Sequence, residues 1–349
     1  MSKVTINVVA KHAGVSKKTV SRVLNDEPNV SAATKEKVKA VFKELGYRPS
    51  PVARGLATNR SFLIGLVYDN PNKAYVSDIQ NGALSVCNDK GYHLLINPID
   101  HESDDLLLSI EKLWTESRLD GLVLTPPFSD MQPLIAMLDQ LNADYVRVGA
   151  TLFGEDIHAK IDEEPVRASH LSPCVISNDE QAAFEMTRYL ISLGHDKIGF
   201  VKGHPDHPVT EQRYEGYLKA LRAAGLIENP DYIVQGMFDF RSGEDCGRQL
   251  LSLDDRPTAI FASNDYMAAG ILKVASQKGI AVPHELAVTG FDNAPIARHL
   301  WPSLTTVKQP IEEMAAAAIE QLLARSSDRL QMDSVLVVRE STAPFQSAS

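Results

Sequence analysis

From residue 61 onward, the chain alternates short apolar runs rich in β-branched residues with amphipathic helical stretches. The expected strands are FLIGLVY, HLLIN, GLVLT, YVRVG, KIGFV, AIFAS, LAVTG and VLVVR. Helical periodicity lies between them, over residues 79–89, 106–116, 181–193, 213–224, 243–251 and 266–278. Such alternation produces parallel sheets with helices on both faces. Residues 61–349 are therefore predicted to form an α/β body of two doubly wound parallel-sheet lobes, with a ligand cleft between them.

The charge of the chain is unevenly distributed. Residues 1–60 carry 12 Lys and Arg against 4 Asp and Glu, a net charge of +8. The remaining residues carry 23 against 41, a net charge of −18. A basic segment attached to an acidic body indicates a polyanionic partner for that segment, a partner that the body repels.

Three short helices are predicted within the first 48 residues, which form the α-helical head. Thr5, Ser16 and Ser31 are suited to cap their N-termini, because a side-chain oxygen there can accept from a free backbone N–H. Gly14 and Gly46 are suited to end the first and third helices, since glycine adopts the left-handed backbone without strain. Helix, glycine-containing turn and helix is the pattern that places a second helix in the major groove of DNA.

The second predicted helix, residues 17–24, presents long hydrogen-bond donors on its outer face. Arg22 is the best candidate for reading bases, because an arginine can donate two hydrogen bonds to guanine. Lys17 and Lys18 are suited to bases or to phosphates. The lysines of the third helix are better explained as a solvated face.

Residues 49–60 are predicted to be a hinge or linker. Two prolines restrict the backbone, and the following two helical turns are too short to be stable alone. Two interpretations remain open. The segment is a simple linker, or it folds on DNA and inserts Leu56 into the minor groove as an apolar wedge.

Polar and aromatic residues follow the strands of the body, where ligands bind in such folds. The candidates are Asp69, Asn70, Tyr75, residues 126–128, 263–265 and 291–293, with Arg147 inside the fourth strand and Arg213 at the start of a helix. Carboxylates, amides and arginine among aromatics suit a polyhydroxylated ligand. Structural roles remain open for some: Asn264 as a turn residue, Arg213 as the partner of an acid, and Asp179 as a helix cap.

Other functional classes receive little support. No GxGxxG after a strand, GxxxxGK[ST], HExxH or GxSxG motif is present, so no enzyme activity and no cofactor are predicted. The three cysteines are widely spaced, without CxxC, and are expected to be reduced core residues, with no metal site. No membrane span or signal peptide is recognisable, so a cytoplasmic location is expected.

The head and hinge resemble those of the LacI/GalR family of bacterial regulators. TINVVAKHAGVSKKTVSRVLN and VSAATKEKVKAVFKELGYRPSPVARGLATNRS carry this resemblance. It implies base reading by Lys17, Lys18 and Arg22. It also implies phosphate or base contacts from Thr5, Ser16, Thr19, Ser21 and Asn25, and minor-groove contacts from Ala53 and Leu56. Val8 departs from the family, which usually has an acid there that completes a capping box with Thr5.

The body resembles the same family, whose fold is similar to that of periplasmic sugar-binding proteins. The segments are SNDEQAAFEMTRYLISLGHDKIGFVKG, RYEGYLKALRAAGL, FASNDYMAAG, VTGFDNAPIARHLWPSLTTVKQP and VVRESTAPF. By this resemblance Arg213, Asn264 and Asp292 contact the effector, Tyr75, Phe238 and Phe261 form its aromatic lining, and His207 lies near it. Residues 151–173 are longer and more charged than is usual in the family.

The combined expectation is a sequence-specific transcriptional regulator with a small-molecule sensor. A repressor of a carbohydrate operon, changed by a sugar-like effector, fits the family habit best. A non-sugar metabolite acting as corepressor, such as a nucleobase, and a solute-binding protein without a regulatory role are the alternatives. The chain ends without a heptad segment, so a homodimer on a pseudo-palindromic double-stranded DNA operator is expected.

Overall fold

The structure is a computed structural model that describes residues 4–24, 29–47, 60–150 and 173–345. It divides into two compact units, Met1–Phe62 and Leu63–Ser349. The predicted DNA contacts of Asn25, Ala53 and Leu56 lie outside the described residues, as do residues 49–59 of the predicted hinge and the charged segment 151–172.

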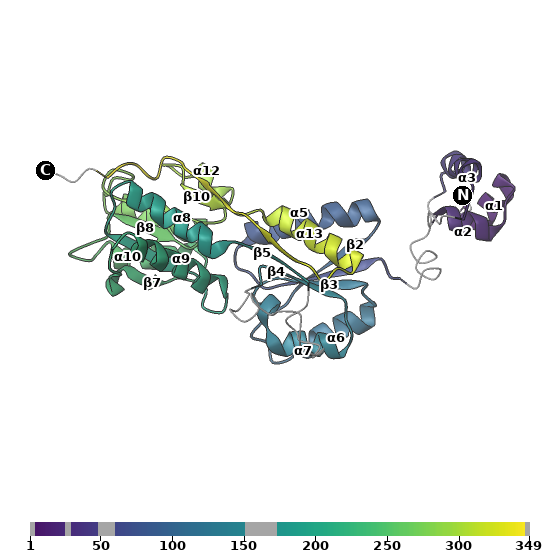
Figure 1. The fold of residues 1–349 in the computed structure, drawn as a ribbon, viewed down its shortest axis with the longest axis horizontal. Helices are drawn as coiled ribbons and strands as arrows, with labels where there is room; N and C mark the ends of the chain where they lie inside the picture. The colour runs from purple at the N-terminus through teal and green to yellow at the C-terminus, as the bar shows by residue number, and fades with distance from the viewer. Residues whose placement is uncertain (1–3, 25–28, 48–59, 151–172, 346–349) are drawn as a thin grey trace. The chain divides into compact units, whose positions relative to one another are not determined.

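The described residues of the first unit form three helices (Figure 1, purple). They are α1 (Ile6–Ala13), α2 (Lys17–Leu24) and α3 (Ala32–Leu45). Small and β-branched side chains from all three form its core, including Val9, Val20 and Val38, none of which is exposed to solvent. The predicted helix-turn-helix head is confirmed.

The helix ends follow the sequence signals except at Thr5. Gly14 and Gly46 adopt left-handed backbone angles and end α1 and α3. Ser31 accepts a hydrogen bond from the N–H of Thr34 and caps α3. Thr5 takes the extended backbone of an N-cap residue, but its side chain makes no capping hydrogen bond, so that prediction was wrong. Val8, in the third helical position, also has no oxygen with which to complete a capping box.

The N-terminal lobe of the second unit is built on a six-stranded sheet of order β11-β5-β4-β3-β1-β2. Its strands, all parallel, are β1 (Leu63–Tyr68), β2 (His93–Pro98), β3 (Gly121–Leu124), β4 (Tyr145–Val148), β5 (Cys174–Ser177) and β11 (Arg329–Met332). Its main helices are α5 (Lys73–Lys90), α6 (Leu106–Ser117), α7 (Gln132–Gln140) and α13 (Ile311–Ala324), with a short 3-10 turn, η1 (Phe128–Asp130). Helices α5 and α13 pack together on one face, and α6 and α7 lie on the other (Figure 1).

The C-terminal lobe contains a four-stranded parallel sheet of order β7-β6-β8-β9. Its strands are β6 (Ile198–Lys202), β7 (Ile233–Gln235), β8 (Ala259–Ala262) and β9 (Ala287–Thr289). Helices α8 (Asp179–Ser192) and α9 (Val209–Ala223) pack as one pair, and α10 (Phe240–Leu250) and α11 (Asp265–Gln277) as another. The remaining short helices are η3 (Pro230–Tyr232) and α12 (Ile296–His299). Two separate apolar cores include residues of the two pairs, so the predicted doubly wound architecture is confirmed.

One predicted strand pairs differently from the rest. VLVVR contains β12 (Val335–Val337), which pairs with β10 (Thr306–Lys308) in an antiparallel two-stranded ribbon. The ribbon joins the C-terminal lobe, where isolated bridges link Thr289 to Thr305 and Asp292 to Lys308.

The chain passes between the lobes after β5, after β10 and after β11, and the three crossover segments are hydrogen-bonded to one another. In the first, the side chain of Asn178 donates to the Asp333 carboxylate at 3.0 Å and accepts from the N–H of Ser334 at 2.8 Å, both in the third. Ser177 donates to the Gln309 amide oxygen, in the second, at 3.3 Å. The two lobes are therefore joined by a linked bundle of three segments.

In the described residues, no helix combines the length and apolarity needed to cross a membrane. Cys87, Cys174 and Cys246 are buried and form no disulfide, as the sequence predicted.

The helix pair α5 and α13 depends on a glycine at its contact. A Cβ placed on Gly82 of α5 would stand 2.0 Å from the backbone oxygen of Glu312 in α13. Backbone of a packed helix cannot move aside as a flexible side chain can, so only glycine permits this approach.

Gly82→Ala is expected to destabilise the protein by about 2 kcal/mol, because an overpacking cost of about 3 kcal/mol outweighs the gain of about 1 kcal/mol in helix propensity. Ser77→Ala, at an exposed position of the same helix, is the matched control and should leave stability nearly unchanged. Denaturant unfolding followed by circular dichroism measures both. Equal stability of the two variants would show that the helices separate at little cost.

Candidate functional site

The outer face of α2 carries the predicted base-reading residues. Lys17 and Lys18 are exposed, Ser21 and Arg22 are partly exposed, and Val20 on the opposite face is buried. The helix therefore anchors itself by one face and presents donors on the other, as a recognition helix does.

The hydroxyls of Ser16 and Thr19 are engaged with each other at the start of α2. Ser16 Oγ accepts from the N–H of Thr19 at 3.1 Å and lies 2.9 Å from its hydroxyl oxygen. Ser16 thus caps α2 as predicted. A DNA phosphate at this helix end would also meet the positive pole of the helix.

A pocket lies in the second unit at the carboxyl ends of both sheets. It has a volume of about 470 Å³, counting the space at its mouth. Its lining from the N-terminal lobe is Asn70, Asn72, Tyr75, Pro126, Gly149, Ser177, Ile311 and Met314. Its lining from the C-terminal lobe and the second crossover is His207, Val209, Arg213, Phe238, Asn264, Asp292 and Gln309.

Arg213 is fixed by several buried contacts. Its Nε donates to the Asp179 carboxylate at 2.7 Å, and its Nη1 donates to the Ser263 carbonyl at 2.6 Å. The guanidinium carbon lies 3.8 Å from the ring centroid of Phe291, a cation–π contact. Because the side chain is held before any ligand arrives, its remaining donors are pre-oriented toward the pocket. The sequence left open an acid partner for Arg213, and the structure provides one in Asp179. The cap role left open for Asp179 was wrong, because Asn178 is the N-cap residue of α8 and Asp179 is the first residue of the helix.

Asp292 connects the two lobes. Asn72, at the start of α5, donates from its side-chain amide to one Asp292 oxygen at 2.7 Å. Gln309 donates to the other oxygen at 2.7 Å, and Arg213 Nη1 lies 3.9 Å away. Burial raises the pKa of Asp292 to about 7, although Arg213 and Gln309 act in the opposite direction.

Asn264 is the N-cap residue of α11 rather than a turn residue, and it also lines the pocket. Its oxygen accepts from the N–H of Met267 at 2.9 Å and caps α11, and its amide donates to the Phe238 carbonyl at 2.7 Å. These bonds attach the loop after β7, which contains Phe238, to the start of α11. The neighbouring Asp265 is fully buried and accepts from Thr306 and from the N–H of Ala294.

Aromatic rings reach the pocket from both lobes, Tyr75 from α5 and Phe238 from the loop after β7. The ring of His207 lies edge-on to Phe238, with centroids 5.6 Å apart. Burial lowers the pKa of His207 to about 4, so its neutral imidazole offers one donor and one acceptor. The pocket thus combines apolar faces with polar groups of both kinds.

Seven of the nine residues predicted to contact an effector line this pocket: Asn70, Tyr75, His207, Arg213, Phe238, Asn264 and Asp292. The structure places the other two elsewhere. Phe261, in the middle of β8, is fully buried in the C-terminal core with Phe200 and Phe291. Arg147 is buried inside β4, opposite Cys174 of β5, and is absent from the lining.

Sequence reasoning missed several lining residues, of which Asn72 and Gln309 hold Asp292. Asn72 had a signal, since it precedes a helix and shares a loop with Asn70. Gln309 follows the short strand β10, which the sequence pattern did not reveal. Ile311 and Met314 lie at the start of α13, and as apolar helix residues they carry no chemical signal of ligand contact.

The fold and site define a class of protein: a basic helix-turn-helix head joined to a two-lobed body that holds a small-molecule pocket between its lobes. Comparison with known proteins agrees. The profile for bacterial regulatory proteins of the lacI family matches residues 5–50, and that of the periplasmic binding protein-like domain matches residues 187–342.

The relatives extend this match over nearly the whole chain. The HTH-type transcriptional repressor PurR of Vibrio atlanticus (strain LGP32) is 34% identical over 329 residues, covering 93% of this chain and 92% of the relative. A lac repressor dimer bound to operator and an anti-inducer superposes with a TM-score of 0.78 at 27% identity, covering 98% of this chain and all of that one. The transcriptional regulator CelR in complex with cellobiose gives a TM-score of 0.71 at 28% identity, with 97% and 99% covered. The chain therefore belongs to the lacI family of bacterial transcriptional regulators.

The raised pKa of Asp292 predicts a pH dependence of stability. In the folded protein Asp292 keeps its proton up to about pH 7, whereas the unfolded chain releases it near 3.8. Between these values the folded state binds more protons, so the free energy of unfolding falls as the pH rises, by at most about 4 kcal/mol from this group. Asp292→Asn should remove this contribution, and its stability relative to the wild type should rise from pH 5 to pH 8.

Denaturant unfolding at the two pH values measures the difference, and Asp254→Asn, an exposed acid of the same lobe, is the control. A stability difference between wild type and Asp292→Asn that does not change with pH would contradict the predicted proton binding.

Proposed function

We propose that this protein represses transcription by binding a pseudo-palindromic operator as a homodimer, and that a small polar effector in the pocket between the lobes changes its affinity for DNA. The observation that carries the proposal is the pocket itself. Its lining joins carboxyl-end residues of two sheets, and Asp292 in one lobe is hydrogen-bonded to Asn72 in the other. A ligand that replaces this bond acts on both lobes at once.

The head supplies the DNA contacts. Arg22 donates to base edges in the major groove, with Lys17 and Lys18 on bases or phosphates. Thr5, Ser16, Thr19, Ser21 and Asn25 serve as polar contacts near the backbone, and Ala53 and Leu56 as minor-groove contacts. Two heads are needed because one makes few contacts, and the lac repressor dimer on its operator is the precedent among the similar structures.

A sugar or glycoside is the favoured effector. Each sugar hydroxyl is both donor and acceptor, and Arg213, Asp292 and Asn70 offer complementary groups, while Tyr75 and Phe238 suit the apolar face of the ring. The cellobiose complex of CelR supports this choice. A nucleobase is the second candidate, because aromatic rings from both lobes also suit a planar ligand.

The effect on DNA follows from differential binding. An effector that favours one arrangement of the lobes shifts the population of the DNA-competent state, and a coupling of about 1–3 kcal/mol changes operator affinity about 5–150-fold. The direction depends on which arrangement the effector favours, so an inducer and a corepressor are both compatible with this pocket.

The central experiment is binding of the full-length protein to the DNA upstream of its own gene, with and without saccharides and nucleobases. No sequence-selective binding under any condition would leave only a solute-binding role.

Arg22→Ala is expected to weaken binding to the specific operator by about 5–150-fold, the equivalent of one bidentate base contact of about 1–3 kcal/mol. Weak, salt-sensitive binding to unrelated DNA should remain. Fluorescence anisotropy with operator and scrambled duplexes measures both. Lys43→Ala, at an exposed position of α3, is the matched control. Undiminished discrimination by Arg22→Ala would remove this residue from base reading.

Tyr75→Phe is expected to raise the effector concentration for half-maximal response about tenfold, since it deletes one hydroxyl from the pocket and keeps the ring. Operator affinity without effector should stay unchanged. Tyr68→Phe, outside the pocket lining, serves as control. If Tyr75→Phe responded to effector like the wild type, Tyr75 would have no polar role in recognition.

A further inference from the structure

A second contact between the lobes lies outside the lining of the effector pocket. His101 follows β2 in the N-terminal lobe, and Asp206 lies in the loop after β6 in the C-terminal lobe. The Nε2 atom of His101 is 3.3 Å from an oxygen of Asp206. Glu102 adds a carboxylate, and the three ligand atoms all lie within 4.8 Å of one another. One imidazole and two carboxylates therefore converge from two lobes.

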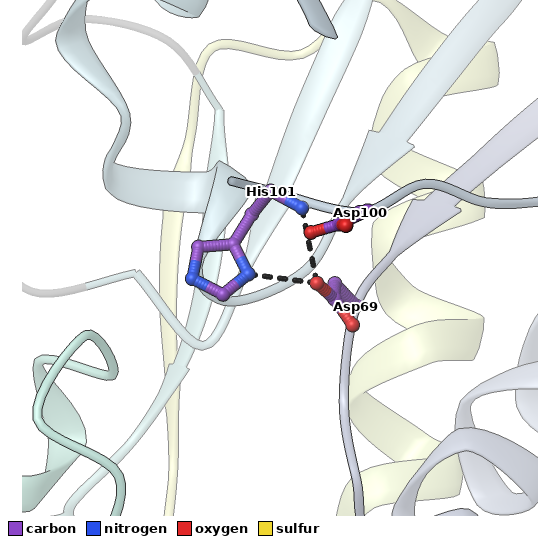
Figure 2. A group of neighbouring side chains, drawn as sticks. All are labelled: Asp69, Asp100 and His101. Atoms are coloured by element: carbon purple, nitrogen blue, oxygen red, sulfur yellow. Dashed lines mark hydrogen bonds and ion pairs between the residues drawn. The ribbon is translucent and has the colours of Figure 1, made fainter. Parts of the chain in front are cut away.

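The imidazole of His101 is held in place from behind. Figure 2 shows Asp69 facing the ring: its carboxylate accepts from Nδ1 at 2.7 Å and from the backbone N–H of His101 at 3.0 Å. A histidine that donates from Nδ1 to a carboxylate can bind a metal ion through Nε2, the arrangement usual for metal-binding histidines. Without an ion, Nε2 of His101 donates to Asp206, so an ion that binds here displaces the Nε2 proton. Asp100 accepts from the N–H of Glu102 at 3.0 Å, which orders the turn that carries both ligands.

The spacing of the ligand atoms suits a tetrahedral ion. Two ligands bonded at about 2.0 Å to a tetrahedral centre lie about 3.3 Å apart. His101 Nε2 and the Asp206 oxygen form a hydrogen-bonded ion pair at this separation, 3.3 Å. The pair is therefore spaced as two ligands of one ion are.

The ligand types indicate which ions suit the site. Imidazole nitrogen with carboxylate oxygen suits zinc and its divalent neighbours, whereas calcium and magnesium prefer oxygen ligands alone. Three protein ligands leave one tetrahedral position for water. Glu102 and Asp206 are exposed, so an ion has access from solvent.

We propose that His101, Glu102 and Asp206 form a binding site for a divalent transition-metal ion of the zinc class, and that the ion bridges the two lobes. Asp69 is a positioning residue that acts through His101. The ion bonds to both lobes and so favours the arrangement in which they are in contact. This site is independent of the effector and of DNA, so its test does not depend on the proposed regulatory function.

The test is a zinc titration of the untagged full-length protein by isothermal calorimetry, with thermal unfolding as a second readout. The wild type should bind one zinc ion per chain at this site, with a rise in unfolding midpoint. His101→Ala and Asp206→Asn should each weaken binding at least tenfold and abolish the shift, and the double variant should lose no more than either single one. Asp69→Asn should weaken binding about 10–100-fold, because the ring loses its orientation.

His93→Ala is the matched control, since His93 is an exposed histidine at the other end of β2 and takes no part in the cluster. It should bind zinc like the wild type. Asp206 and Glu102 are exposed, so Asp206→Asn and Glu102→Gln should fold normally. These two variants therefore test the site even if His101→Ala fails to fold. Zinc binding unchanged in Asp206→Asn would overturn the bridge between lobes. Zinc binding lost equally in His93→Ala, or absent from the wild type at 100 µM, would overturn the site.

Discussion

The body of this regulator depends on how one buried cation and two acids are compensated. Asp179 and Arg213 form an ion pair at 2.7 Å inside the C-terminal lobe, and Asp292 lies 3.9 Å from the same guanidinium. A charge removed from water is costly unless it is paired and hydrogen-bonded. Burial raises the pKa of Asp292 to about 7, and its carboxyl group is hydrogen-bonded partly from outside its own lobe, by the side chain of Asn72. The requirement that creates the ligand pocket thus also holds the lobes together.

The head meets a different constraint, because its core is small. Its three helices bury mainly valines and alanines, so correct helix ends matter more than in the large body. Ser16 and Ser31 supply caps, and glycines end α1 and α3. Thr5, in contrast, makes no capping hydrogen bond through its side chain, so α1 lacks the side-chain cap that α2 has. Helix α2, which carries the predicted base-reading residues, is thereby the better capped of the two.

The sequence predicted the lobes because parallel strands buried on both faces are continuous apolar runs, and the pocket because ligand groups follow such strands. It failed where the signal is short or local. Strands β5, β7, β10 and β11 were missed: each has three or four residues, and polar residues interrupt or flank them. Strands of the same length, such as β3 and β8, were recognised because they are wholly apolar. Phe261 and Arg147 point from the middle of strands rather than their ends, and only tertiary packing decides that they are buried away from the ligand. The side-chain bond between Asn72 and Asp292 joins residues 220 positions apart, which no local pattern encodes.

The crossover segments have a mechanical consequence. Two bodies joined by one flexible strand can twist, shear and separate in any direction, and each such freedom costs entropy when a ligand fixes it. Here three crossover segments join the lobes and are hydrogen-bonded to one another through Asn178 and Ser177. These bonds restrict twisting and separation of the lobes, and rotation about the bundle is the main movement that they leave. A movement with one main axis converts the binding of a small molecule into a displacement of fixed direction. The direction of this displacement is set by the backbone connections between the lobes rather than by the ligand.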